Sequence, residues 1–232
     1  MTGWQRFSQI ISWPPGQADF DWRASIATVA QDGPFSAFPG IARSITLLSG
    51  EGMQLTDGIG VNHVLNTVGE PFEFSGDLAL HAHLLGGETM DFNLMTRRTV
   101  CLPGVVALRG SGTVSREQGG VLFAIQGDWQ LPDGTRLGAG EGIWWPPTSD
   151  SCQTTQWPIS ALHTVDAQKT RSLLLWAAVI ACCGASCTGL AHPAHLFDST
   201  GRENHWPQAE ITGKAGIAEL AQSLLYLFGL LV

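Results

Sequence analysis

Apolar and polar residues alternate over short runs through most of the chain, and turns rich in glycine and proline separate the runs. A period of two residues is typical of a β-strand with one buried face. In the run 22–29, Arg23 and Ser25 fall on the same predicted face. No long amphipathic helical pattern occurs before about residue 165. The pattern therefore predicts an all-β fold of many short strands.

A weak internal repeat relates residues 46–58 to residues 122–134. Each copy contains an apolar strand, a turn with glycine and an acidic residue, a short strand that ends in Gln-Leu, and an Asp-Gly turn. Asp-Gly is a favoured connection in β-hairpins. Two copies of one short-strand unit predict a duplicated antiparallel barrel or sandwich. We expect its halves to cover about residues 8–95 and 96–168.

The segment 90–98 places polar groups inside an apolar run. As a strand, it would direct Asp91 and Asn93 to one face and Phe92 and Leu94 to the other. A carboxylate and an amide on one strand face are suited to orienting a small polar ligand. The alternative is that both residues cap a turn, because Asp and Asn side chains readily bond their own backbone.

The composition changes towards the C-terminus. Residues 173–191 carry no charge, and residues 215–232 form a second apolar stretch. We expect a helical C-terminal extension over 169–232, beyond a β domain that covers 1–168. The uncharged run is long enough to span a bilayer, so membrane association is an alternative, but its small and polar residues favour a packed extension. A third alternative is a tail without a part in the function.

The net charge of the chain limits the classes of molecule that it is expected to bind. The formal net charge is −8 at pH 7. Nucleic-acid binding needs a basic face, so we expect no nucleic-acid partner. The five cysteines are an odd number, and the N-terminus shows no apolar signal region. These features favour a cytoplasmic protein with reduced thiols. The sequence does not indicate an oligomeric state.

One alternative for the function is a metal-dependent enzyme. His81 and His83 lie two residues apart on one predicted strand face, and Glu88 follows them, which is a donor set that can bind a divalent ion. Such a site needs a further histidine from the second half, and none lies between His83 and His163. The chain also has no Gly-x-Ser-x-Gly motif and no phosphate-binding loop.

The remaining polar candidates favour binding over catalysis. Acid–base catalysis needs a histidine or a carboxylic acid with a perturbed pKa beside the ligand, and these candidates are mostly arginine, amide and hydroxyl groups. They lie near aromatic and proline turns, as in a small-molecule pocket. An arginine there can bind a carboxylate through two parallel hydrogen bonds. The candidates are Arg23, Ser25, Phe38, Arg43, Asp91, Asn93 and Met95.

The same residues carry a resemblance to a known family. Segments 19–27, 32–43, 90–97 and 119–123 resemble the HutD/Ves family in order and spacing, and the Ves branch in particular. The resemblance implies a duplicated cupin-like (bicupin) barrel that lacks the cupin metal histidines. It implies no cofactor, and it does not imply an enzyme activity. Family chains begin with a glycine-rich segment that this chain lacks, and they have no counterpart of its residues from about 170 onward.

The family resemblance also implies a role. The HutD branch is associated with histidine utilisation through binding of a pathway metabolite, and the Ves branch with the stress response. We therefore expect a non-catalytic protein whose partner is a small, polar, anionic metabolite; a cupin-type enzyme is the alternative. The expected roles are charge binding by Arg23 and Arg43, orientation of the polar end by Asp91 and Asn93, a hydroxyl from Ser25, and apolar walls from Phe38 and Met95.

Overall fold

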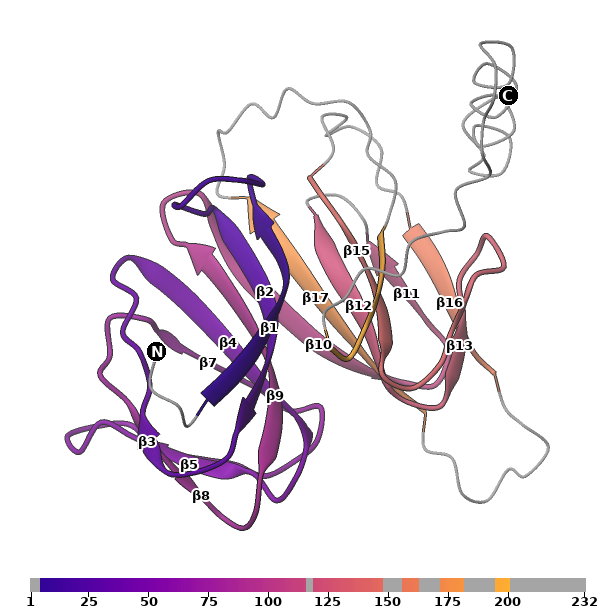
Figure 1. Cartoon of the computed structure of the whole chain (residues 1–232). Helices are drawn as coiled ribbons and strands as arrows, with labels where there is room; N and C mark the ends of the chain where they lie inside the picture. Colours follow the sequence, from indigo (N-terminus) through magenta and orange to yellow (C-terminus); the bar gives the residue numbers. More distant parts are fainter. Residues whose placement is uncertain (1–4, 116–118, 148–155, 163–171, 182–194, 201–232) are drawn as a thin grey trace, which may run out of the picture.

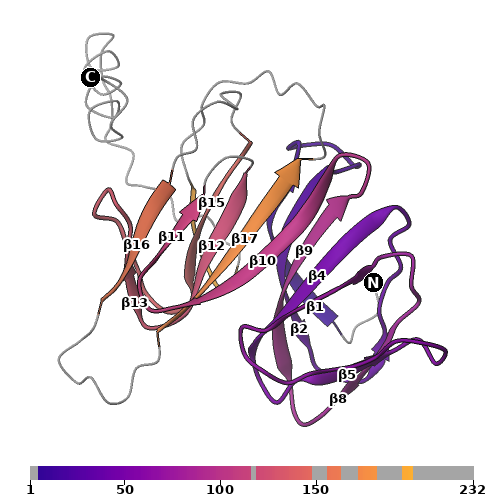
Figure 2. The ribbon, with the colours of Figure 1, turned by 180° about the vertical axis from the view of Figure 1, so that it is seen from behind.

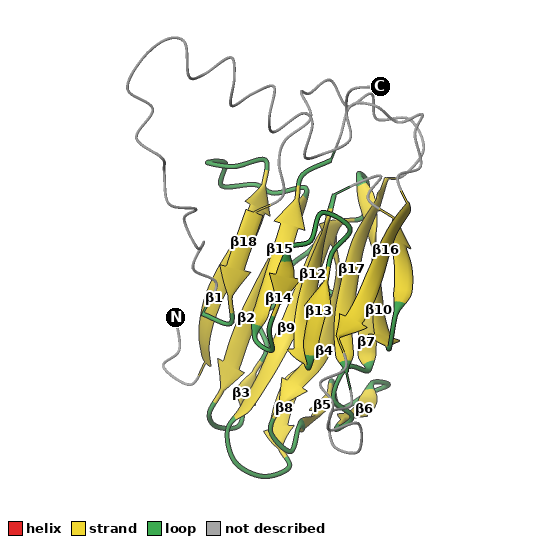
Figure 3. Ribbon diagram, turned by 90° about the vertical axis from the view of Figure 1, so that its right-hand side faces the viewer, coloured by secondary structure: helices red, strands yellow, loops and turns green. Residues whose placement is uncertain are grey.

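The computed structural model describes residues 5–115, 119–147, 156–162, 172–181 and 195–200, and every regular element in these ranges is a β-strand (Figures 1 and 3). The strands are β1 (Gln5–Trp13), β2 (Trp22–Val29), β3 (Gly33–Pro34), β4 (Ile41–Ser49), β5 (Met53–Thr56), β6 (Asn62–Leu65), β7 (Pro71–Ser75), β8 (His81–Leu84), β9 (Thr89–Arg97), β10 (Cys101–Arg109), β11 (Gly112–Ser115), β12 (Gly120–Gln126), β13 (Asp128–Gln130), β14 (Arg136–Leu137), β15 (Glu141–Trp145), β16 (Gln156–Leu162), β17 (Leu173–Ala181) and β18 (His195–Asp198). The all-β prediction is confirmed.

The strands form two halves, each with a five-stranded and a four-stranded antiparallel sheet. The first half contains the sheets β1-β2-β9-β4-β7 and β3-β8-β5-β6. The second half contains β10-β17-β12-β15-β18 and β11-β16-β13-β14. Figures 1 and 2 show the two halves side by side, with the two long sheets between the short ones. The two long sheets therefore meet face to face.

The order of strands in the first half recurs in the second. From β2 to β9, each strand has a counterpart eight strands later, and the counterparts follow in the same order within their sheets. The edge strands β1, beside β2, and β18, beside β15, have no counterpart among the described strands of the other half. The stretches 46–58 and 122–134 occupy matching places in this order, and Gly50 and Gly127 open their turns with φ of 94° and 76°. Glycine adopts such angles without steric cost. The repeat in the sequence thus corresponds to two units with the same strand order.

Apolar side chains fill three layers. Between the long sheets, residues such as Trp22 and Phe92 of the first half pack with Phe123 and Leu175 of the second. A second layer lies inside the first half and a third inside the second half. The residues of β2, β4 and β9 that do not face the other half therefore face the interior of their own half.

The expected helical C-terminal extension is wrong where the structure describes it. Residues 173–181 form β17, which pairs with both β10 and β12, and residues 195–198 form β18, which pairs with β15. The proposed boundary after residue 168 therefore cuts through the second half. A strand that is buried on both faces lacks polar alternation, so its sequence resembles that of a buried helix. Residues 182–194 and 201–232 lie outside the described ranges.

Within the described ranges, the structure contains no helical segment with the length and hydropathy of a membrane span. The uncharged run that suggested one begins with β17, whose Leu174 and Leu175 point into the two different layers on either side of it. The apolar character of this part of the run is therefore explained by burial inside the protein.

Candidate functional site

The polar candidates lie on the face of β2, β9 and β4 that points into the first half. Directly opposite residues of antiparallel strands share one face, so the strand register defines three rows across these strands. The rows are Arg23–Met95–Arg43, Ser25–Asn93–Ile45 and Ala27–Asp91–Leu47. Phe38 joins them from the β3–β4 connection, through its contacts with both arginines. The structure thus brings all seven predicted residues together.

Aromatic rings surround the two arginines. The guanidinium carbon of Arg23 lies 4.6 Å from the ring centroid of Phe20 and 5.2 Å from that of Phe38. The guanidinium carbon of Arg43 lies 5.4 Å from Phe38 and 5.0 Å from Phe74. Phe38 therefore contacts both guanidinium groups. A ring face attracts a cation, so the rings stabilise two charges that would otherwise be poorly solvated.

The two arginines differ in their access to solvent. Arg43 is 3 % exposed, and burial lowers its pKa to about 10, so that it stays protonated at neutral pH. Its Nη1 donates a hydrogen bond to the carbonyl of Ser36 at 3.1 Å. Arg23 is half-buried, and burial likewise lowers its pKa. Its Nη2 lies 3.0 Å from the sulfur of Met95, a weak acceptor. Within the described residues, neither arginine forms an ion pair with a carboxylate.

The acid and the amide of β9 are buried deeper in the same face. Asp91 is 0 % exposed and Asn93 is 3 % exposed. Among the described residues, no hydrogen-bond partner reaches either carboxylate oxygen of Asp91 or the Oδ1 of Asn93. Burial raises the pKa of Asp91 to about 7, although the charge of Arg43 opposes the shift. Buried polar atoms in native proteins are normally bonded, so these three atoms retain the capacity to accept hydrogen bonds from a polar partner.

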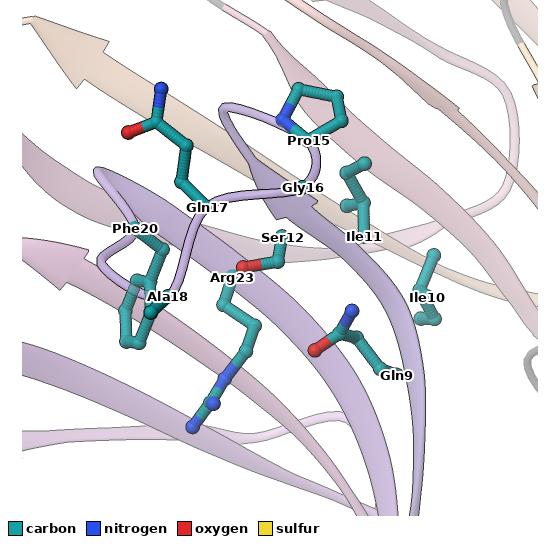
Figure 4. Close-up of a pocket in the computed structure, with 10 residues that line it drawn as sticks. All are labelled: Gln9, Ile10, Ile11, Ser12, Pro15, Gly16, Gln17, Ala18, Phe20 and Arg23. Atoms are coloured by element: carbon teal, nitrogen blue, oxygen red, sulfur yellow. The ribbon is translucent and has the colours of Figure 1, made fainter.

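A cavity of about 350 Å³ opens beside Arg23. Figure 4 shows Phe20 on one side of the Arg23 side chain and Gln9 on the other, with Ser12 above it. Gln9 is paired with Ser25, and Ser12 is paired with Arg23. They extend the rows of Ser25 and Arg23 onto β1, and we call the three rows the polar rows. The complete lining is Gln9, Ile10, Ile11, Ser12, Pro15, Gly16, Gln17, Ala18, Phe20 and Arg23. The cavity gives solutes access to Arg23, the more exposed of the two arginines.

The second half lacks these polar groups. The register of β10, β17 and β12 defines the corresponding rows, with the β12 irregularity after Ala124 matching the β4 irregularity after Leu47. The corresponding rows are Gly104–Ala178–Gly120, Val106–Trp176–Leu122 and Leu108–Leu174–Ala124. In these rows, each arginine, acid, amide and hydroxyl group of the first half thus corresponds to glycine, an aliphatic residue or tryptophan in the second half. Among the described residues, only the rows of the first half carry this set of polar groups.

Comparison with known proteins places the chain in a family. The family model described as HutD matches residues 4–161, which is more than half of the chain. The chain belongs to the HutD family. Among solved structures, HutD from Pseudomonas fluorescens SBW25 is 24 % identical, with a TM-score of 0.62, over 76 % of this chain and 90 % of that one. A conserved protein of unknown function from Pseudomonas aeruginosa PAO1, PA5104, is 26 % identical, with a TM-score of 0.61, over 77 % and 90 %.

The fold is also similar to that of cupins. A cupin 2 conserved barrel domain protein from Leptotrichia buccalis is 10 % identical to this HutD-family chain, with a TM-score of 0.50, over 75 % of this chain and 88 % of that one. At this identity the likeness concerns the fold alone. The HutD resemblance of the sequence is therefore confirmed, together with a cupin-like, all-β architecture.

The structure does not assemble the alternative metal site of the HutD-family chain. The β8 residue Ala82 points into the first half, so His81 and His83 point away from it. The Nδ1 of His83 lies 3.2 Å from a carboxylate oxygen of the exposed Asp32. In the part of the chain that the structure describes, no group of three His, Cys, Asp or Glu residues could hold a metal ion, and Glu88 completes none.

Sequence reasoning missed the cavity residues Gln9, Ser12 and Gln17. The apolar run 8–13 predicted a strand, but the register of β1 shifts between Gln9 and Ile11. This irregularity adds one residue, so Gln9 and Ser12 reach the same side of the sheet although they are three apart. The polar character of both residues was the only available signal, and strict alternation places them on opposite faces.

Proposed function

We propose that this HutD-family protein binds a small anionic metabolite and has no catalytic role of its own. The observation that carries the proposal is the pair of arginines that share the Phe38 ring without an ion-paired carboxylate among the described residues. An unpaired buried charge is costly, and an anionic ligand would remove that cost. Membership of the family supports a regulatory part in histidine utilisation, in the cytoplasm, and the Ves-like segments support one in the stress response.

The repeated strand order supports a duplicated cupin-like (bicupin) architecture. In this proposal only the first half binds the ligand, and the second half supports it through the apolar layer between the long sheets. The polar rows of the first half support a binding role for it, and their apolar counterparts support a structural role for the second half.

We assign the site residues by their depth. Arg23 lines the cavity and would contact the anion first through a bidentate pair. Arg43 lies behind Phe38 and adds positive potential. Asn93 and Asp91 would orient the polar end of a ligand that reaches further into the first half. The remaining contributions are the hydroxyl of Ser25 and the apolar walls formed by Phe38 and Met95.

A ligand screen tests the proposal. Melting of the full chain would be followed with urocanate, with N-formylglutamate and with an uncharged amide of similar size. A ligand at a hundredfold excess over its dissociation constant stabilises the protein by about 2.7 kcal/mol. We expect a carboxylate, but not the amide, to raise the melting temperature.

Two variants test whether the rise in melting temperature depends on the proposed site. Arg23→Ala should lose most of the shift, because the proposed first contact with the anion is gone. Arg97→Ala is the matched control. Arg97 follows Met95 by two residues on β9, just beyond the last of the three rows. Its only described ion pair is a 3.9 Å contact with the exposed Asp19. The proposal fails if no carboxylate stabilises the protein, or if Arg23→Ala retains the full shift.

A further inference from the structure

Backbone hydrogen bonds fix the main chain at Phe38. The N–H of Phe38 donates to the carbonyl of Gly76 at 2.6 Å, and the N–H of Gly76 donates to the carbonyl of Ile41 at 2.8 Å. The N–H of Ile41 in turn donates to the carbonyl of Phe38 at 3.2 Å. A Cβ at Gly76 would lie 2.6 Å from the carbonyl oxygen of Phe38, so only glycine allows this approach. The β3–β4 connection is thus fastened to the end of β7.

A charged pair on the outside fastens the same connection. The Nη1 of Arg98 donates to the carbonyl of Ile41 at 3.1 Å and to the hydroxyl of Ser75 at 2.8 Å, and its Nη2 donates to the carboxylate of Asp77. The other carboxylate oxygen of Asp77 accepts the N–H of Gly40 at 2.8 Å. The N–H of Arg98 donates to the carbonyl of Gly40 at 3.1 Å. We call Arg98 and Asp77 the clamp.

The pKa of Asp77 agrees with this geometry. The N–H of Gly40 lowers it most, followed by the hydroxyl of Ser75 and by Arg98. Asp77 therefore remains ionised at neutral pH, and the clamp keeps its charge. A planar guanidinium can hold three acceptors at fixed angles, which the single ammonium of a lysine cannot do.

The Phe38 ring borders both members of the arginine pair. Burial lowers the pKa of Arg43 most, the charge of Asp91 opposes this shift, and the like charge of Arg23 lowers the pKa by a smaller amount. The Phe38 ring contacts both groups, and its π face offers negative potential to each. If the ring moved away, water would enter between the guanidinium groups and screen their common field.

We propose that Arg98 and Asp77 are positioning residues of the anion site, because they hold the Phe38 ring against Arg23 and Arg43 without contacting the ligand. This inference rests on the proposed function for its effect on affinity, but the position of the ring can be measured without any ligand. A clamp outside the site would let substitutions at the surface tune anion affinity inside it.

The first experiment measures the environment of the Phe38 ring. The full chain carries 4-fluorophenylalanine at position 38, and its ¹⁹F NMR signal is compared between the parent protein, Arg98→Lys and Asp77→Asn. We expect both variants to move the signal towards that of a solvated ring, because each weakens the hold on Gly40 and Ile41. Arg97→Lys is the control, since Arg97 has the same chemistry one position earlier and should leave the signal in place. Unchanged signals in both clamp variants would overturn the proposal.

The second experiment is a double-mutant cycle on the dissociation constant of N-formylglutamate. Arg98→Lys should weaken binding about tenfold when Phe38 is present, which is the size expected for the loss of one partly buried cation–π contact. In the Phe38→Ala background it should cause no further loss, because the clamp acts through the ring. A purely structural role would lower the melting temperature equally in both backgrounds without this dependence.

The outcomes separate the two proposals. If Arg98→Lys weakens binding equally in both backgrounds, the clamp does not act through Phe38 and the inference fails. If the parent protein binds no N-formylglutamate while the fluorine signal responds to the clamp variants, the positioning role stands and the choice of ligand under the proposed function is wrong.

Discussion

Among single residues, Asp91 is the ionisable group whose pKa burial raises most clearly. Its carboxyl group has a pKa of about 7 in the folded protein, against an ordinary value near 3.8. Between these values the folded state holds a proton that the unfolded state has lost. The free energy of unfolding therefore falls as the pH rises from about 4 to about 7, by up to roughly 4 kcal/mol.

Asp91→Asn should remove this dependence. The amide is isosteric and cannot ionise, so we expect the variant to match the parent protein near pH 4 and to exceed its stability at pH 8. Denaturant unfolding at several pH values measures the difference. Asp57→Asn is the contrasting control, because backbone N–H groups of Gly60, Ile59 and Val61 lower the pKa of Asp57, and that variant should lose stability at neutral pH instead. A parallel pH profile for Asp91→Asn and the parent protein would contradict the shift.

The sequence predicted the polar rows because the period of a strand determines which residues share a face. Arg23 with Ser25, and Asp91 with Asn93, follow from alternation alone, and the alternative of a turn at Asp91 is wrong because both residues lie within β9. Alternation does not say which face is buried. For that reason the exposure of His83 could not be predicted, and neither could the lack of hydrogen-bond partners for the Asp91 carboxylate among the described residues.

At the scale of elements, β17 is a strand that the hydrophobic pattern of the sequence could not predict. Its residues alternate between the layer shared by the two long sheets, which receives Leu175, and the layer inside the second half, which receives Leu174. Both layers are apolar, so the alternation in space leaves no alternation in the sequence. Long-range pairing with β10 and β12 decides that the segment is a strand, and no local pattern encodes that pairing.

Leu174→Ala tests the place of β17 in the fold. Leu174 is fully buried, and removal of a buried leucine side chain costs about 2–5 kcal/mol. Leu102→Ala is the matched control on the neighbouring β10, because Leu102 is exposed and its loss should cost less than about 0.5 kcal/mol. Chemical denaturation compares the two. Equal stabilities would mean that residues 173–181 are not part of the folded core.

At the scale of the whole molecule, the two halves share a strand order but not an interior. The repeat in the sequence predicted the shared order, because turn residues recur at matching places. It could not predict which half would hold the site, since the counterpart of β9 is β17, a segment that the pattern assigned to an extension. The polar rows and their counterparts are defined by the strand register in the two halves, which no local pattern encodes.

This comparison suggests Asn93→Leu, which gives the first half the apolar character of the second. The Oδ1 of Asn93 is buried without a partner in the described structure, and such a group costs about 1–3 kcal/mol. We expect the variant to melt at a higher temperature and to bind carboxylates more weakly. Polar groups that serve binding often reduce the stability of the folded protein. Calorimetry and titration with N-formylglutamate measure the two effects. A variant that is less stable and binds unchanged would argue against a binding role for this row.

The presence of the polar rows in one half alone has a consequence for the history of the protein. Selection for a ligand can act on the interior of the first half, where a conservative change such as Arg23→Lys alters the chemistry of the site. In the second half, selection acts only on volume and hydrophobicity, so leucine, isoleucine and valine can replace one another there with little penalty. Substitutions on the interior face of the first half should therefore be more tightly constrained than those at the corresponding positions of the second half.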